Sequence, residues 1–382
     1  MCEGSSTNPA TRPATSSTPA ATQPNNATDH EVVLVAENIE SDAASDLGSS
    51  VASSSTSVSS SVLEYRMENG RTYHAYKDGS MWESQPPPLF VVGVSDISRS
   101  SEYFFPNDER ENDRLDLQHN LFILTFDNKL ATAPPNDPGA KVGHVLDVGT
   151  GSGIWAIDFG EEHPDAEVCG VDLSAVQPDF VPPNVKFEID DIDQPWTFSE
   201  PFDYIHSRMM NSSIKDWKAY IQTCFDNLSP GGYLELIEFD AVPTSDDGTL
   251  KPDSAIKRSA TLLFDAAAIL GRPFEDISRM KEVLTETGFR DVHKQLYKWP
   301  TNSWPKNPKH KELGIWNHEN AIAGWEGFCM APCTRVHGWS REEVLILMAE
   351  ARKEFKDRTI HAYFNIWSIY GRKPLVSEEP SN

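Results

Sequence analysis

The feature that most constrains the fold is a buried apolar strand that runs directly into a glycine-rich turn and then into a helix. The strand and turn are Val145-Leu-Asp-Val-Gly-Thr-Gly-Ser-Gly153, and the helix begins with Ile154-Trp-Ala-Ile-Asp158. Glycine lets the backbone turn sharply and approach a ligand without contact from a Cβ atom. A strand, a glycine turn and a helix in this order open a nucleotide crevice in an α/β sheet. The sequence therefore predicts a ligand site at this turn.

The spacing of the glycines indicates which nucleotide the turn suits. A dinucleotide-binding turn has the pattern G-x-G-x-x-G, which places a glycine where this chain has Ile154. The pattern here is G-x-G-x-G, formed by Gly149, Gly151 and Gly153. Asp147 lies two residues before the first glycine, where a carboxylate opposes a pyrophosphate but suits an ammonium group on the ligand. These features disfavour an NAD-dependent dehydrogenase.

Further acids follow at the ends of the next two predicted strands. Asp172 closes the second strand, where an acid bonds ribose hydroxyls, and Asp190 and Asp191 close the third. Asp191 is placed to accept a hydrogen bond from an adenine amino group, beside the apolar Ile192. Together the acids predict a site for a nucleoside that carries positive charge. The predicted cofactor-binding set is Asp147, Gly149, Thr150, Gly151, Gly153, Asp172, Leu173, Asp190, Asp191 and Ile192.

Short apolar runs alternate with helical patterns after residue 144, which is typical of a parallel α/β sheet with helices on both faces. We expect a Rossmann-like sheet with seven strands at 144–148, 167–171, 185–189, 202–207, 233–238, 292–299 and 362–370. We expect helices at about 106–124, 216–228, 254–270, 277–287, 309–323 and 341–355. Ser229-Pro-Gly-Gly232 is expected to end a helix and form a turn.

Composition divides the chain into four regions. Residues 1–60 are rich in Ser, Thr, Ala and Pro with scarcely any aromatic residues, so we expect a disordered acidic tail. Residues 61–140 are expected to form an N-terminal helical cap with an insertion near 80–102. The main domain is expected at 141–374, with a helical insertion at about 300–358, followed by a C-terminal tail at 375–382.

The net charge of −25 repels polyphosphates, which disfavours direct nucleic-acid binding through a broad basic face. No targeting pattern is evident, and the apolar run at 31–36 is far too short to span a bilayer, so we expect an intracellular protein in the cytoplasm, the nucleus or both, with no membrane partner. Five scattered cysteines fit a reducing compartment. Cys329 and Cys333 lack a nearby Cys or His pair, so no metal is expected.

The chain resembles the class I S-adenosylmethionine-dependent methyltransferases, and within them the LaeA-like group of filamentous fungi. The matching segments are 146–159, 170–178, 181–191, 202–208 and 228–234, with further matches at 70–76, 114–119, 338–342 and 370–374. The resemblance implies the Rossmann-like methyltransferase fold and S-adenosyl-L-methionine as the cofactor. Two segments depart from it: the long tail, and residues 80–102, which intervene before Tyr103-Phe-Phe-Pro-Asn-Asp108.

Two functions fit this resemblance. The first is a methyltransferase that acts on a small-molecule acceptor, a secondary metabolite. The second is a LaeA-like regulator of secondary metabolism and development that acts through velvet-type protein partners, for which an acidic disordered tail is suited. Both share the cofactor site, so the motifs do not separate them. No Asp/Asn-Pro-Pro-Tyr motif follows the fourth strand, so methylation of an adenine or amide nitrogen by that mechanism is not supported.

Several residues outside the glycine turn have two interpretations each. His206, at the end of the fourth strand, is the candidate catalytic base because its ordinary pKa lies near neutrality, or it packs under the cofactor. Arg208 binds an acidic substrate or pairs with local acids. Tyr73, His74 and Tyr76 either close over the cofactor as a lid or pack against the edge of the sheet. The apolar side chains near the end of the chain either line an acceptor pocket or belong to the hydrophobic core. They are Trp316, Trp325, Phe328 and Met330.

Overall fold

The computed structural model describes residues 34–36, 65–74 and 103–378. The predicted insertion at 80–102, Tyr76 and most of the predicted tail lie outside the described residues. Within the tail, however, the carbonyl of Val35 accepts a hydrogen bond from the backbone N–H of Lys306 at 2.9 Å, and Ala36 pairs with Pro305. These two residues of the predicted tail therefore contact the main domain.

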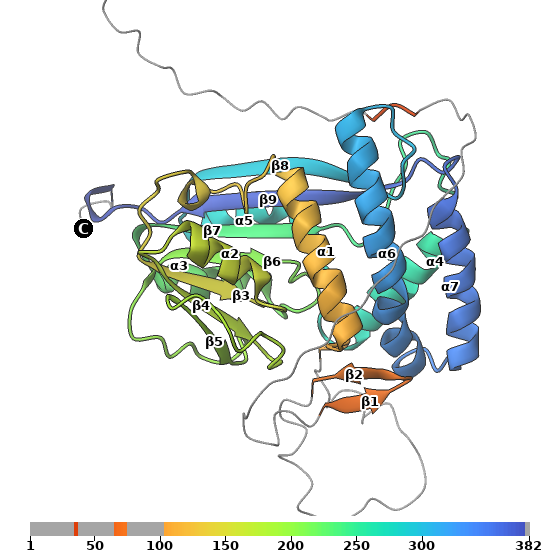
Figure 1. Ribbon diagram of the computed structural model, residues 1–382, viewed down its shortest axis with the longest axis horizontal. Coiled ribbons are helices and arrows are strands. Elements are labelled where there is room, and N and C mark those ends of the chain that lie inside the picture. The colour runs from red at the N-terminus through yellow and green to blue at the C-terminus, as the bar shows by residue number, and fades with distance from the viewer. Residues whose placement is uncertain (1–33, 37–64, 75–102, 379–382) are drawn as a thin grey trace, which may run out of the picture. The chain divides into compact units, whose positions relative to one another are not determined.

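Seven strands form one mixed sheet in the order β5-β4-β3-β6-β7-β9-β8 (Figure 1). Strands β3 to β7 pair in parallel, and β9 is antiparallel to both of its neighbours. The strand order reverses between β3 and β6, and open α/β sheets bind ligands at the carboxyl ends of strands at such a point. This sheet confirms the predicted Rossmann-like fold. The strands are β3 His144–Val148, β4 Glu167–Asp172, β5 Val185–Ile189, β6 Phe202–Arg208, β7 Leu228–Phe239, β8 Arg290–Pro300 and β9 Tyr363–Arg372.

Helices cover both faces of the sheet, as the alternation along β3 requires. Val145 packs in one core with Phe159 of α2, whereas Leu146 packs in another with Ile221 of α3 and Leu284 of α5. Successive strand residues point to opposite faces, so both faces of this buried strand need a partner. The helices are α1 Glu109–Thr125, α2 Ile154–Glu162, α3 Trp217–Asp226, α4 Ala255–Ile269, α5 Met280–Thr287, α6 Pro308–Arg335 and α7 Arg341–Lys356.

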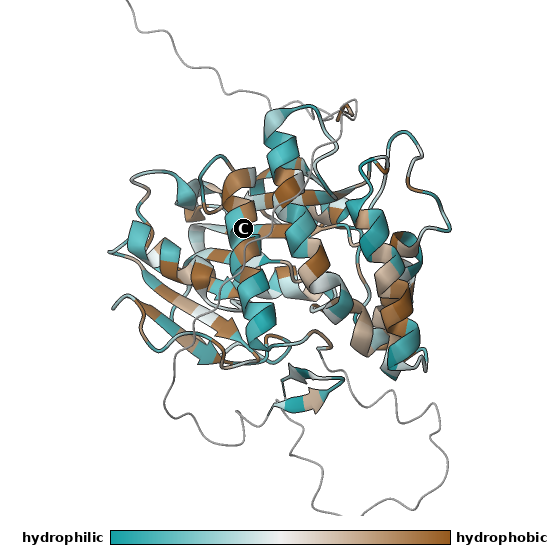
Figure 2. Ribbon diagram, turned by 45° about the vertical axis from the view of Figure 1, so that its right-hand side comes forward, coloured by the Kyte–Doolittle hydropathy of each residue, from teal (hydrophilic) through white to brown (hydrophobic). Residues whose placement is uncertain are grey.

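A third core joins α1, α4, α6 and α7 to the ends of β8 and β9, and includes Phe122, Trp299, Trp325 and Phe355. In Figure 2 hydrophobic residues gather on the strands and along one side of several helices, while hydrophilic residues occupy the outer turns. No helix in the described part of the chain is long and apolar enough to cross a membrane. This helical layer closes the space above the sheet edge where α1 and α6 run side by side (Figure 1).

Helix α6 continues to Arg335, well beyond the predicted end near residue 323. It packs against α1, α4, α7 and β8, so several of its sides are buried. A helix buried on several sides lacks the single apolar stripe by which a helix is recognised in a sequence. Pro332 lies inside its last turns and also suggests an earlier end.

Two further predictions need correction. The described part of the N-terminal cap holds a hairpin of β1 Arg66–Glu68 and β2 Arg71–Tyr73 ahead of α1, so the cap is not purely helical. Its turn, Asn69-Gly70, has positive φ angles at both residues, as hairpin turns favour. In addition, Ser229 to Gly232 belong to β7, because Leu228 pairs with Phe202 and the strand absorbs the irregularity as a bulge.

Candidate cofactor and acceptor site

The glycine turn lies at the carboxyl end of β3, and its conformation requires glycine. Gly149, Gly151 and Gly153 have φ angles of 68°, 58° and 82°, in the left-handed region that side chains disfavour. A Cβ atom on Gly149 would lie 2.2 Å from the sulfur of Met210. Any other residue at position 149 would therefore need the Met210 side chain to move, in addition to the disfavoured φ angle. Gly153 ends the turn as the N-cap residue of α2.

The carboxylate of Asp147 lies beneath this turn and does not face the cavity beside it. Asp147 is 3% exposed, and its oxygens bond the hydroxyl of Thr150 at 2.5 Å and Nδ1 of His206 at 2.7 Å. Neither Asp147 nor Thr150 lines either of the two cavities described below. This placement differs from the expectation that Asp147 meets an ammonium group on the ligand. The side chain instead fixes the turn to the neighbouring strand.

His206 also lies in the core. It is fully buried, and its ring stacks on Trp155 with centroids 3.7 Å apart. Burial lowers its pKa, and the Asp147 carboxylate opposes that shift. Among the residues that the structure describes, the Nε2 atom is buried without a hydrogen-bond partner, and His206 lines neither cavity. The geometry therefore favours the packing interpretation over the catalytic base.

A cavity of about 740 Å³, counting the solvent at its mouth, lies at the carboxyl ends of β3, β4, β5 and β6. Within it Asp172 accepts hydrogen bonds from the backbone N–H of Gly151 at 2.9 Å and of Ser174 at 3.0 Å. Burial raises the pKa of Asp172 to about 6. We call this space the cofactor cavity. It brings together seven of the ten predicted cofactor residues, Gly149, Gly151, Asp172, Leu173, Asp190, Asp191 and Ile192.

Arg208, at the end of β6, contributes a cation to the cofactor cavity. Its guanidinium contacts Nδ1 of His119 at 3.3 Å, and in the described part of the chain no carboxylate lies within 4.0 Å of it. Burial lowers its pKa to about 10, so the group stays charged at neutral pH. A buried cation without a carboxylate partner is costly unless a ligand supplies one.

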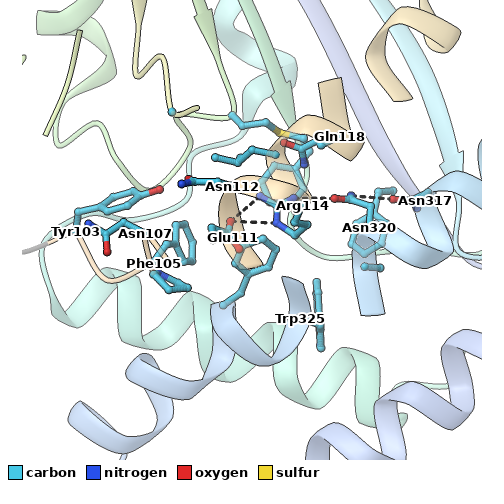
Figure 3. Close-up of a pocket in the computed structure, with 18 of the residues that line it drawn as sticks. Tyr103, Phe105, Asn107, Glu111, Asn112, Arg114, Gln118, Asn317, Asn320 and Trp325 are labelled. Carbon is cyan, nitrogen blue, oxygen red and sulfur yellow. Dashed lines mark hydrogen bonds and ion pairs between the residues drawn. The ribbon is translucent and has the colours of Figure 1, made fainter. Parts of the chain in front are cut away.

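A second cavity, of about 1050 Å³ with the solvent at its mouth, lies between α1, α6 and the ends of β8 and β9. We call it the acceptor cavity (Figure 3). Trp325 and Phe328 line it, as one interpretation expected, whereas Met330 is core and Trp316 lies elsewhere. The expected lid is not formed by Tyr73, which packs in a separate core with Phe104. His74 instead contacts the carbonyl of Tyr103 at 3.2 Å.

The sequence did not single out the polar wall of the acceptor cavity. Glu111 and Arg114 of α1 form a buried pair at 2.7 Å, and Arg114 also bonds the amide oxygen of Asn320 at 2.7 Å (Figure 3). The available signal was the spacing of Glu111, Arg114 and Gln118, which places all three on one helix face.

The two cavities share part of their walls. Tyr103, Leu115, Gly151, Asp172 and Met209 line both. A donor bound at the glycine turn and an acceptor bound between α1 and α6 would therefore meet at a common border. This arrangement suits the transfer of a group from one ligand to the other.

A model of the methyltransferase domain matches residues 117–294. Methyltransferase pytC of Aspergillus terreus is 40% identical to this chain over 82% of it and 89% of that protein. The secondary metabolism regulator LAE1 of Cochliobolus heterostrophus is 36% identical over 81% and 94% of the two chains. The protein-methionine methyltransferase laeA of Emericella nidulans is 33% identical over 82% and 77%.

This chain belongs to the LaeA-like methyltransferases. It is therefore an S-adenosylmethionine-dependent methyltransferase, as its sequence predicted. Among solved structures, phosphoethanolamine N-methyltransferase 2 of Haemonchus contortus aligns with a TM-score of 0.39 and 18% identity, over 76% of this chain and 62% of that one. The individual cofactor contacts of this LaeA-like chain remain predictions.

Proposed function

We propose that this LaeA-like chain methylates a small-molecule acceptor, a secondary metabolite, held in the acceptor cavity. The observation that carries the proposal is the border shared by the two cavities, at Tyr103, Leu115, Gly151, Asp172 and Met209. A deep cavity beside the donor site is what a small acceptor needs. The names of two relatives support methyl transfer and a link to secondary metabolism, because pytC is called a methyltransferase and LAE1 a secondary metabolism regulator.

The residues of the cofactor cavity fit S-adenosylmethionine. Asp172 would hold the ribose hydroxyls, and Asp191 with Ile192 would hold the adenine. Arg208 would pair with the carboxylate of the methionine part, because no carboxylate among the described residues lies within 4.0 Å of this cation. Gly149 would line the site beside them. When bound, the cofactor supplies a methyl group activated on a sulfonium.

Alignment of the two reactants is the main catalytic contribution that this chain offers. Holding reactants in line contributes on the order of 7–11 kcal/mol to lowering a barrier. The methyl group would pass from the sulfur to the acceptor heteroatom, and a proton lost by the acceptor would pass to water. Glu111 does not act as the base because its carboxylate already holds Arg114.

The test incubates the full chain with S-adenosylmethionine that carries a deuterated methyl group and with a fungal culture extract. Mass spectrometry is expected to show a labelled small molecule. Asp172→Asn is expected to abolish the label, whereas Asp226→Asn, a matched change on the exposed face of α3, leaves it. Protein that binds S-adenosylhomocysteine but labels no small molecule contradicts the proposal.

The second candidate is a regulator that acts through velvet-type protein partners, and the names of LAE1 and laeA favour it. For laeA the name also specifies a protein methionine as the substrate. The same incubation separates this candidate from the first, because label would then appear on protein. Capture of a velvet-type protein by the full chain, and altered transcription of metabolite genes in a deletion strain, would support it. Fluorescence microscopy of the tagged chain tests the predicted cytoplasmic or nuclear location.

A further inference from the structure

Apart from Asp172, at the border with the cofactor cavity, the charged side chains that line the acceptor cavity, Glu111 and Arg114, balance each other. The Glu111 and Arg114 side chains are 7% and 4% exposed and lie 2.7 Å apart. Arg114 gives a further hydrogen bond to Asn320, and Asn320 lies 3.4 Å from the amide oxygen of Asn317 (Figure 3). A charged group of a ligand against this wall would lack a counter-charge, and a buried charge without one is costly.

The remaining wall is aromatic. Phe105 and Phe328 meet edge to face with their centroids 5.0 Å apart, and Arg114 lies 5.0 Å above the Phe328 ring. Trp299 of β8 and Trp325 of α6 also line the cavity. Flat aromatic side chains bury large apolar areas and stack or meet the edge of other rings. The surface therefore suits a ligand with an apolar ring system.

One buried polar atom in this cavity has no hydrogen-bond partner among the described residues. Asn107 is 9% exposed and lines the acceptor cavity, and this atom is its Oδ1. Its Nδ2 atom donates to the hydroxyl of Ser174 at 3.2 Å. If the amide were turned over, the hydroxyl would donate to the oxygen and the nitrogen would be left unpaired instead. In either orientation Asn107 needs a neutral polar partner, and a ligand can supply it.

We propose that the acceptor is an uncharged aromatic molecule that carries a hydroxyl or an amide N–H, and that Asn107 binds this group. The proposal rests on the proposed function, and it adds the chemical class of the acceptor and the residue that recognises it. A hydroxyl pairs with Asn107 in both orientations of the amide because it donates and accepts. A carboxylate or an amine on the same ring system lacks a counter-charge among Glu111, Arg114 and Asn320.

The experiment measures binding of three matched probes, naphthol, naphthoate and naphthylmethylamine, to the full chain saturated with S-adenosylhomocysteine. Calorimetry is expected to show naphthol binding at least about tenfold more tightly than either charged probe. Asn107→Leu is expected to lower naphthol affinity about tenfold, whereas Asn120→Leu, the same change on the exposed side of α1, has no effect. The proposal is overturned if naphthol and naphthoate bind with equal affinity, or if Asn107→Leu binds naphthol as tightly as the original protein does.

Two further variants keep the proposal testable if Asn107→Leu does not fold. Asn107→Asp adds a negative charge and is expected to shift preference from naphthol to naphthylmethylamine. Glu111→Gln leaves Arg114 uncompensated and is expected to raise naphthoate affinity. Unchanged preferences in both variants overturn the proposal.

S-adenosylhomocysteine affinity, measured in each variant, separates damage to the donor site from a change in recognition. Selective naphthol binding without labelling of any extract molecule would refute only the proposed function.

Discussion

The guanidinium of Arg208 lies 3.3 Å from Nδ1 of His119, and Nε2 of His119 lies 2.8 Å from the carboxylate of Asp158. A guanidinium donates hydrogen bonds and cannot accept one, so Nδ1 of His119 must be the acceptor, and this places the ring proton on Nε2, facing Asp158. Burial lowers the pKa of His119, which keeps the ring neutral in agreement with this arrangement. Helices α1 and α2 thus orient the arginine at the end of β6.

Arg208→Met is expected to weaken S-adenosylhomocysteine binding by about ten- to a hundredfold, because a charged hydrogen bond to the ligand carboxylate is lost. Calorimetry measures this affinity. The control is the decarboxylated analogue, which cannot pair with Arg208 and is expected to bind both proteins alike. If the variant lost affinity for both ligands equally, the assignment of Arg208 to the carboxylate would be wrong.

Gly149→Ala tests the close approach at the glycine turn. The positive φ angle costs a side chain about 1–3 kcal/mol, and the new Cβ atom would meet the sulfur of Met210 at 2.2 Å. Gly248→Ala is the matched control, because its φ is 69° and nothing lies within 4 Å of the added atom. Both variants are expected to lose stability, but only Gly149→Ala loses cofactor affinity as well. Denaturant unfolding and calorimetry provide the two measurements.

His206→Asn separates a packing role from a catalytic one. Loss of the stacked ring and of its bond to Asp147 is expected to lower the free energy of unfolding by about 1–3 kcal/mol. Turnover per folded molecule is expected to stay within about threefold, whereas loss of a general base costs about a hundredfold or more. A drop of that size, together with a changed pH–rate profile in the folded variant, would restore His206 as the base.

Glu238 is expected to make stability depend on pH. Its two oxygens accept hydrogen bonds from the backbone N–H groups of Met210 and Asn211, and burial raises its pKa from 4.5 to about 8. The folded state therefore binds the proton more tightly than the unfolded state, and the stability from this group is lost as pH rises toward 8. Between pH 6.5 and 8 the free energy of unfolding is expected to fall by about 2 kcal/mol.

Denaturant unfolding across this range measures the effect. The window begins at 6.5 because the lowered pKa values of His119, His163, His206 and His310 act mainly below it and with the opposite sign. Glu238→Gln cannot titrate and is expected to flatten the curve. A slope that persists in this variant would show that another group is responsible.

The sequence predicted the sheet well because its central strands are buried on both faces. The strands at 144–148 and 185–189 have the observed bounds, and the glycine turn lies where the pattern placed it. Buried parallel strands appear as continuous apolar runs, and a turn with positive φ angles requires glycine, so both leave local signals. The acids Asp172, Asp190 and Asp191 also meet at one edge, since parallel strands end together.

Tertiary structure alone decided which of these polar groups face a ligand. Asp147 and His206 lie on neighbouring strands in register, so they bond each other beneath the turn, and a sequence does not show such pairing. The acceptor cavity likewise joins Asn107 and Glu111 to Asn320, more than two hundred positions later. The sequence by itself determined the fold and the methyl donor through local backbone and burial requirements. The walls of the acceptor cavity arise only when α1 and α6 pack together, because contacts between distant segments leave no local pattern.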